Sequence, residues 1–359
     1  MKQSQIKPPN QLPNQLSARS ILIWRIVQTL VWLFGVFIIF NLIFYPTLGI
    51  HLFWNILIPV APLLLVVGVG LWRNVCPMAS TALFSRHMKL SKRRKLTISQ
   101  SGKLNLIAII MLFLIVPLRH AYFNTSGLAT AILLLLLAAI AVITSFFFEW
   151  KSAWCSGLCP IHPVEKLYGL KTKLTLPNAH CTACHKCVTP CPDSTPKTHP
   201  LSVKKTNYHK LAGVLTVGAF PGFVWGWFQV PDYHEIVSIE NLLYVYKIPF
   251  YGLFASLIVY LILSRVFKKK ILMAIFSAVA ISCYYWYRIP ALLGFGLFPG
   301  DGMLIDLSGT LPEWIVQSIV YALSLFFFVW IVLSKQKGKS WVIRPAYTNE
   351  INKFQRKPA

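Results

Sequence analysis

Eight long apolar stretches recur along the whole chain, and they constrain its fold more than any other feature. A helix needs ~20 mostly apolar residues to cross the hydrocarbon core of a bilayer, with a lower limit of ~17. The stretches are 21–44, 52–72, 104–123, 128–148, 211–230, 248–264, 271–287 and 314–334. Because they are not confined to the start of the chain, a secretory signal does not explain them. We therefore expect an all-α integral membrane protein with about eight transmembrane helices.

Charged residues make up only 13% of the 359 residues, whereas a soluble domain carries about 25%. Their positions predict the topology. If the N-terminus is cytoplasmic, 31 of the 35 Lys and Arg residues lie in inner segments. Six acidic residues then fall outside: Asp232, Glu235, Glu240, Asp301, Asp306 and Glu313. Since Lys and Arg near short loops are retained in the cytoplasm, both termini are predicted inside, in the cell (inner) membrane.

The net charge of +25 would suggest nucleic acid as a partner of a soluble protein. Here the basic runs 92–95 and 268–270 border apolar stretches, where they attract anionic lipid headgroups. We expect membrane lipids as partners and no nucleic acid.

Four cysteines follow the spacing Cys-x2-Cys-x2-Cys-x3-Cys-Pro, which is typical of bacterial ferredoxins that bind [4Fe-4S] clusters. They are Cys181, Cys184, Cys187 and Cys191. The cytoplasm is reducing, so clustered cysteines there are expected to bind metal rather than to form disulfides. Zinc is the alternative, but zinc sites usually combine two separated cysteine pairs. The spacing therefore favours an iron–sulfur cluster.

Two further cysteine motifs follow apolar stretches. The fourth stretch is followed by Cys155-Ser-Gly-Leu-Cys159-Pro160, and the second is followed by Trp72-Arg-Asn-Val-Cys76-Pro77. Aligned on Cys-Pro, these segments form an internal repeat in which Trp72 replaces the first cysteine. We predict Cys155 and Cys159 as ligands, and Cys76 as either a ligand or a lone thiol. Cys283, within the seventh stretch near its predicted outer end, is predicted to be a small buried apolar residue.

Paired membrane hairpins, Cys-x3-Cys-Pro motifs and a following ferredoxin run resemble the membrane polyferredoxins, a family that includes NapH, MauN and the membrane half of NosR. The resemblance covers roughly residues 20–200. It implies one [4Fe-4S] cluster on the cytoplasmic side, and it leaves room for a second cluster and for a quinone. The implied function is electron transfer between a cytoplasmic donor or the quinone pool and a membrane or periplasmic redox partner, by a component rather than a stand-alone enzyme.

Ligand counting leaves two arrangements open. In the first arrangement, Cys159 completes the cluster of Cys181, Cys184 and Cys187, and Cys191 turns toward Cys155 and Cys76. In the second arrangement, the four cysteines of the run hold a single cluster. In the first arrangement, a second cluster is one thiolate short. The candidates for this ligand are His162, His180, His185 and His199, which are otherwise solvated loop residues or donors to a cluster sulfide.

The predicted organisation has five parts. A cytoplasmic tail (1–20) precedes two transmembrane hairpins (21–148), a small cytoplasmic ferredoxin-like module (149–210) lies between the fourth and fifth helices, and four transmembrane helices (211–334) precede a basic cytoplasmic tail (335–359). Two rival functions stay open, a redox assembly factor for a metalloenzyme and an iron–sulfur regulator.

Two basic positions fall within or at the ends of spans. Arg25 is one turn from the predicted inner end of the first span, where its side chain can extend to the interface. Arg119-His120 ends the third span and is predicted either to contact a quinone or a partner, or to meet lipid headgroups.

Overall fold

The computed structural model describes residues 17–92, 94–149, 151–171, 176–177, 179–182, 206–233, 238–334 and 342–343. This part of the chain is almost entirely helical, and seven of its helices are long and apolar enough to cross a membrane. They are Ala18–Phe44, Pro46–Ala82, Ile98–Ile115, Gly127–Phe147, Ile239–Val266, Lys269–Leu292 and Glu313–Leu333. Each overlaps a stretch predicted from the sequence. The expectation of an all-helical, multi-pass membrane protein is therefore confirmed.

The N-terminal half of the chain contains two helical hairpins. The first pairs α1 (Ala18–Phe44) with a helical run that is kinked at Gly68 and consists of α2 (Pro46–Ile50), η2 (His51–Leu57), α3 (Ile58–Val75) and α4 (Pro77–Ala82). After α5 (Phe84–His87), the second pairs α6 (Ile98–Ile115) with α7 (Gly127–Phe147) through η3 (Arg119–Phe123). Helix α6 begins where it does because Thr97 and Gln100 cap each other's backbone N–H groups, which satisfies two donors of the first turn.

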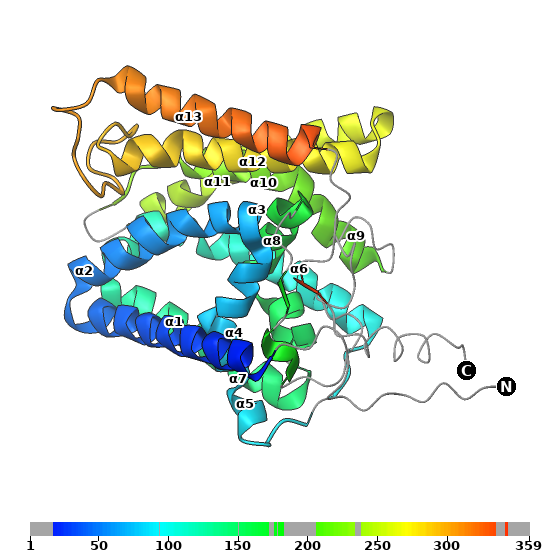
Figure 1. Cartoon of the computed structure of the whole chain (residues 1–359). Coiled ribbons are helices and arrows are strands. Elements are labelled where there is room, and N and C mark those ends of the chain that lie inside the picture. Colours follow the sequence, from blue (N-terminus) through cyan, green and yellow to red (C-terminus); the bar gives the residue numbers. More distant parts are fainter. Residues whose placement is uncertain are drawn as a thin grey trace.

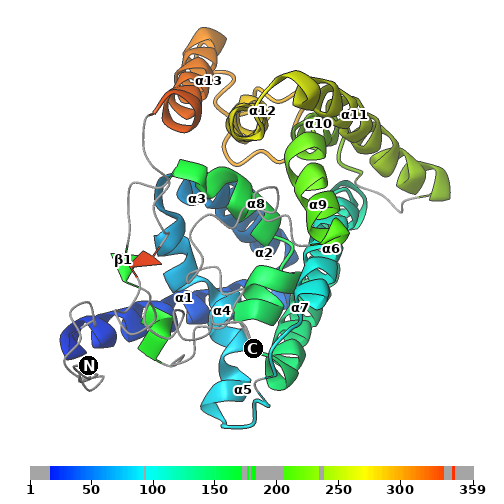
Figure 2. The ribbon, with the colours of Figure 1, turned by 90° about the vertical axis from the view of Figure 1, so that its right-hand side faces the viewer.

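The C-terminal half contains α9 (Asn207–Val214), η7 (Leu215–Ala219), α10 (Phe220–Trp227), α11 (Ile239–Val266), α12 (Lys269–Leu292), and α13 (Glu313–Phe328) with η8 (Val329–Leu333). Helices α12 and α13 lie side by side, as do α10 and α11 (Figure 1). A second view shows α6 beside α9, and α3 with the short helix α8 (His162–Tyr168) in the middle of the molecule (Figure 2).

The predicted fifth span, 211–230, differs from the expectation. It is helical from Asn207 to Trp227 but is not among the seven apolar helices. Gly218, Gly222 and Gly226 are four residues apart, and all three lie against α11. A Cβ built on Gly222 would lie 1.9 Å from the carbonyl oxygen of Gly252. Such close backbone contact is the packing that small residues permit between membrane helices, and this helix is largely covered by protein.

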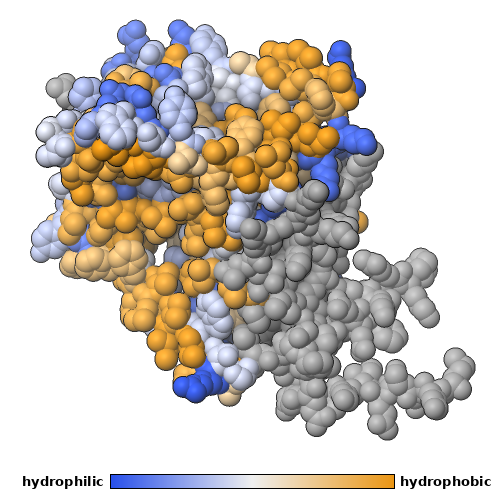
Figure 3. All heavy atoms as spheres, turned by 45° about the horizontal axis from the view of Figure 1, so that its top comes forward, coloured by the Kyte–Doolittle hydropathy of each residue, from blue (hydrophilic) through white to orange (hydrophobic). Residues whose placement is uncertain are grey.

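Large apolar side chains cover much of the exposed surface (Figure 3). On α1, for example, Leu22, Ile26 and Phe44 are all more than half exposed, and Arg25 is exposed among them. A soluble protein rarely exposes contiguous apolar patches of this extent. The surface therefore fits a hydrocarbon environment, and membrane lipids are the expected neighbours.

The chain does not leave the helical body after Cys159. Helix α8 (His162–Tyr168) is buried at all seven residues, and the hydroxyl of Ser277 on α12 donates a hydrogen bond to the carbonyl of Leu167 at 2.7 Å. Helices η4 (Lys151–Leu158) and η5 (Gly169–Lys171) flank α8. The first part of the predicted iron–sulfur module is thus packed among the long helices.

A short parallel strand pair joins the end of the chain to the segment before Cys181. Leu176 of β1 (Leu176–Pro177) is in register with Val342 of β2 (Val342–Ile343). Nearby, the indole N–H of Trp330 donates to the carbonyl of Lys171 at 3.0 Å. The 3₁₀ helix η6 (Ala179–Thr182) follows β1.

Candidate functional site

Three of the predicted ligands come together at one end of the helices. Cys76, Cys155 and Cys159 are partly buried against one apolar cluster, which includes Trp154 at 2% exposure. We call these three residues the thiol cluster. Cys181 lies in η6, but its side chain lies outside the described part of the chain, as do Cys184, Cys187 and Cys191. Cys283 is partly buried against the main core, as predicted for an apolar residue.

The two Cys-Pro motifs have the same local structure. The backbone N–H groups of Met78 and Ala79 lie near Sγ of Cys76, and those of Ile161 and His162 lie near Sγ of Cys159. The N–H of Ala79 donates to the carbonyl of Cys76 at 3.1 Å, and that of His162 donates to the carbonyl of Cys159 at 3.0 Å. In both motifs these N–H groups belong to the second and third residues after the cysteine. The first N–H groups of a helix have no partner within the helix, so a preceding thiol can accept from them. The repeat seen in the sequence is therefore also a repeat in structure.

Burial makes the thiol cluster a poor place for an unbalanced negative charge. Burial raises the pKa of Cys155 well above its usual value, Arg73 and Lys151 oppose this effect, and the two other thiols add to it. Burial also raises the pKa of Cys159 to about 12. Despite the two nearby cations, burial therefore favours the neutral thiol over the thiolate at Cys155 and Cys159.

The start of the ferredoxin run is fixed beside Cys76. The backbone N–H of Ala179 donates to Oδ1 of Asn74 at 3.0 Å. Asn74 is fully buried, and its own carbonyl accepts a hydrogen bond from Gln28 of α1 at 2.9 Å. Since Asn74 is two residues before Cys76, the contact holds the backbone that leads into the run next to the end of α3.

Within the described ranges, no group of three or more His, Cys, Asp or Glu side chains is arranged to hold a metal ion. The thiol cluster alone is thus not a site for a single ion. The chemistry of the side chains is nevertheless compatible with an iron–sulfur cluster. All three are partly buried thiols, and backbone N–H groups lie near Sγ of Cys76 and Cys159.

Two buried ion pairs occur in the segments that carry the Cys-Pro motifs and the chain between them. Nε of Arg73 donates to Oε1 of Glu165, and Nη1 of Arg86 lies 3.3 Å from Oε2 of Glu149. Neither Glu165 nor Glu149 belongs to a recognisable motif. Their position could have indicated a role, because acidic residues are rare in the basic segment where both occur.

The interpretation of His162 and His180 as solvated loop residues is wrong. They are 3% and 5% exposed, because α8 and η6 are packed onto the helical body. Nδ1 of His162 is 3.4 Å from Nη2 of Arg73. His185 and His199 lie outside the described residues.

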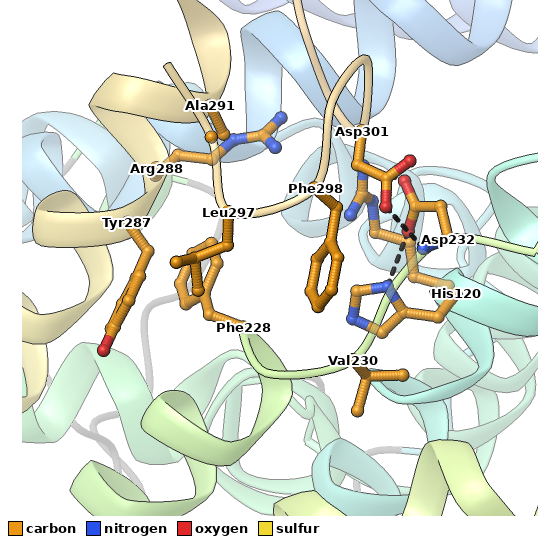
Figure 4. Close-up of a pocket in the computed structure, with 12 residues that line it drawn as sticks. His120, Phe228, Val230, Asp232, Tyr287, Arg288, Ala291, Leu297, Phe298 and Asp301 are labelled. Carbon is orange, nitrogen blue, oxygen red and sulfur yellow. Dashed lines mark hydrogen bonds and ion pairs between the residues drawn. The ribbon is translucent and has the colours of Figure 1, made fainter. Parts of the chain in front are cut away.

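A second polar group of residues lies at the opposite end of the helices. Arg119 and His120 are 3% and 4% exposed, so they do not meet lipid headgroups. Nδ1 of His120 is 2.5 Å from Oδ1 of Asp232, and Nη2 of Arg119 is 3.5 Å from Oδ2 of the same carboxylate. The backbone N–H of Asp232 donates to Asp301 at 2.7 Å (Figure 4). Although burial opposes its ionisation, Arg119 and His120 lower the pKa of Asp232 to about 2.

These residues line a small cavity, which we call the His120 cavity. Its walls include Phe228, Phe298 and Arg288. Nε2 of His120 has no hydrogen-bond partner among the residues that the structure describes, and it points away from Asp232 (Figure 4). Nδ1 of His120 is thus engaged by Asp232, and Nε2 is the ring nitrogen left to contact a ligand in the cavity.

Arg288 connects the His120 cavity to the first hairpin. Nη2 of Arg288 donates to the carbonyl of Trp54 at 2.7 Å and to Oδ1 of Asn55 at 2.8 Å. Trp54 and Asn55 belong to η2, which leads into α3 and so toward Cys76. Arg288 of α12 therefore anchors the wall of the His120 cavity to the first hairpin.

Comparison with known proteins adds no relative. No protein-family model matches the chain, and neither does any curated protein or solved structure.

Proposed function

We propose that the protein is a membrane-bound [4Fe-4S] electron-transfer protein that relays electrons between a cytoplasmic donor or the quinone pool and a membrane or periplasmic redox partner. The observation that carries the proposal is the matched placement of backbone N–H groups near Sγ of Cys76 and of Cys159, together with the anchored start of the ferredoxin run. This supports, at the residue level, the resemblance to the membrane polyferredoxins.

The proposed ligands are the four cysteines of the run, with the thiol cluster contributing to the same or to a second cluster: Cys181, Cys184, Cys187, Cys191, Cys155, Cys159 and Cys76. A bound [4Fe-4S] cluster supplies one-electron transfer. The chain itself does three things. It places backbone N–H groups near ligand sulfurs, excludes water through Trp154 and its neighbours, and fixes the entry of the run through Asn74.

We place the thiol end on the cytoplasmic side of the inner membrane, from the distribution of Lys and Arg residues. On that topology the His120 cavity opens toward the opposite compartment. A redox partner is proposed for either side, and a quinone as carrier in the membrane.

Anaerobic purification tests the proposal directly. The protein should be brown and contain roughly four irons and four acid-labile sulfides per chain, or about eight of each if a second cluster is present. The reduced protein should give an EPR signal and transfer electrons to a soluble ferredoxin or to a short-chain quinone. Stoichiometric zinc without iron would refute the cluster, and a reducible cluster that exchanges electrons with neither carrier would refute the relay.

A further inference from the structure

We propose that the His120 cavity binds a carboxylate, with Arg288 as the counter-charge and Nε2 of His120 as a hydrogen-bond donor. The carboxylate belongs either to a small organic acid or to a fatty acid, which share this head group. The site is separate from the thiol cluster, and the inference does not depend on a bound iron–sulfur cluster.

Arg288 carries a buried charge without a carboxylate at ion-pair distance in the part of the chain that the structure describes. It lies in α12 and is 2% exposed. The two groups that accept hydrogen bonds from it, the carbonyl of Trp54 and the amide oxygen of Asn55, are both neutral. Removing a guanidinium from water without a counter-ion raises the free energy of the folded state. An anion in the cavity would offset this cost.

Asp232 lines the same cavity but is already engaged elsewhere. Its Oδ1 is 2.5 Å from Nδ1 of His120, and its Oδ2 is 3.5 Å from Nη2 of Arg119. Oδ2 also accepts a hydrogen bond from the side-chain amide of Asn124 at 2.7 Å. Both oxygens of this carboxylate therefore have partners, and neither is within ion-pair distance of Arg288.

The two arginines of the cavity approach each other at Gly302. A Cβ built on this glycine would collide with Nη1 of Arg288 and lie 3.2 Å from Nη2 of Arg119. Gly302 has a positive φ of 63°, and the absence of a side chain leaves room for both guanidinium groups. Two like charges repel strongly where little water separates them. Their convergence therefore favours an anion as the ligand.

His120 provides a hydrogen-bonding group for this anion. The residue is 4% exposed, and Nε2 lacks a partner among the described residues. This nitrogen is on the side of the ring that faces away from Asp232 (Figure 4). A protonated histidine donates from both ring nitrogens. The ring would then lie between two carboxylates, that of Asp232 at Nδ1 and that of the ligand at Nε2.

The size of the cavity favours a small head group. The space open to the centre of a water molecule is about 40 Å³, whereas a single water needs about 10–15 Å³. This room suits the few heavy atoms of a carboxylate better than a quinone ring. Phe228, Leu297 and Phe298 form apolar walls, against which the hydrocarbon part of an organic acid can pack.

Calorimetric titration of the full-length protein in a neutral detergent tests the inference. Octanoate should bind, and octanol, which has the same chain without the charge, should not. Acetate separates the two sources: binding of acetate as well identifies a small organic acid, and binding of octanoate alone identifies a fatty acid. Either result supports the carboxylate site.

Two variants connect binding to the cavity. His120→Gln and Arg288→Gln should each weaken octanoate binding by about tenfold or more, because each removes a charge-assisted hydrogen bond. The control is Arg265→Gln, which removes an exposed charge in the last turn of α11 and should bind octanoate like the wild type.

Three results would overturn the inference. They are a wild-type protein that does not bind octanoate, octanol or a short-chain quinone binding as tightly as octanoate, and unchanged octanoate affinity in both cavity variants. The comparison of octanoate with octanol uses the wild-type protein, so it decides the question even if neither variant folds.

Discussion

The backbone N–H of Ala179 donates to the side-chain oxygen of Asn74 at 3.0 Å, across 105 residues of sequence. This contact ties the segment that enters the ferredoxin run to the end of α3. Asn74 is itself held by Gln28 of α1, so three distant parts of the chain meet at one amide. The position of the run is thus determined by the membrane helices as well as by its own cysteine spacing.

Replacement of Cys76 by Ser should lower the iron content by about half, because backbone N–H groups lie near its sulfur as they do near that of Cys159, and it is expected to hold a second cluster. Cys184→Ser should remove the principal cluster. Iron and sulfide analysis with EPR measures both effects. Cys283→Ser is the control and should retain wild-type iron. Unchanged iron in Cys76→Ser would show that Cys76 is not a ligand.

Reporter fusions check the predicted topology. A fusion at Pro200 should behave as cytoplasmic and one at Gly302 as periplasmic, because the basic residues concentrate in the segments predicted inside. Paired alkaline phosphatase and fluorescent-protein fusions report the two compartments. The reverse pair of signals would show that the cysteines lie on the outer side of the membrane. The argument that a reducing cytoplasm favours metal binding over disulfides would then no longer apply.

Asp232 should make stability depend on pH in the acid range. Its pKa falls from 3.8 to about 2 in the folded protein, so its ionised form stabilises the fold above about pH 4, and this contribution is lost as the pH falls toward 2. A shift of this size corresponds to about 2 kcal/mol. Thermal unfolding in detergent should show Asp232→Asn less stable than wild type at pH 7, with the difference narrowing below pH 4.

The matched control for Asp232 is Asp306→Asn. Asp306 is fully exposed and accepts hydrogen bonds from Ser308, which Asn can also accept, so this variant should unfold close to the wild-type temperature. Equal stability of Asp232→Asn and wild type at pH 7 would contradict the role of the Arg119–Asp232–His120 network.

Gly222→Ala should destabilise the contact between α10 and α11. An added Cβ would lie 1.9 Å from the carbonyl oxygen of Gly252 and 2.5 Å from Cβ of Ser256, so the helices must separate. Overpacking of this kind typically lowers stability by about 1–3 kcal/mol, and we expect the loss in Gly222→Ala to lie near the upper end of this range. A lower midpoint of thermal unfolding in detergent would show it. Gly309→Ala, with no atom within 4 Å of the added Cβ, should be neutral, and equal midpoints for the two variants would exclude close backbone packing at Gly222.

Local patterns predicted the features that depend on local physics. Apolar length located seven helices, and Cys-Pro spacing identified Cys76 and Cys159 as copies of one motif. The close packing of the stretch 211–230 could not be predicted. It depends on contacts of Gly218, Gly222 and Gly226 with α11, and a hydropathy pattern carries no information about such contacts. The ion pairs of Glu165 with Arg73 and of Asp232 with His120 could not be predicted for a related reason. Each acid pairs with a residue more than 90 positions away, and such pairs leave no periodic signal.

The pairing of β1 with β2 has a consequence for the timing of biogenesis. The strand just ahead of Cys181 pairs with Val342–Ile343, almost at the far end of the given sequence. Ribosomes deliver the N-terminal part first, at ~5–20 residues per second. The cysteine-bearing segment therefore emerges long before this strand partner exists, and its final bracing waits until α13 has been made and inserted.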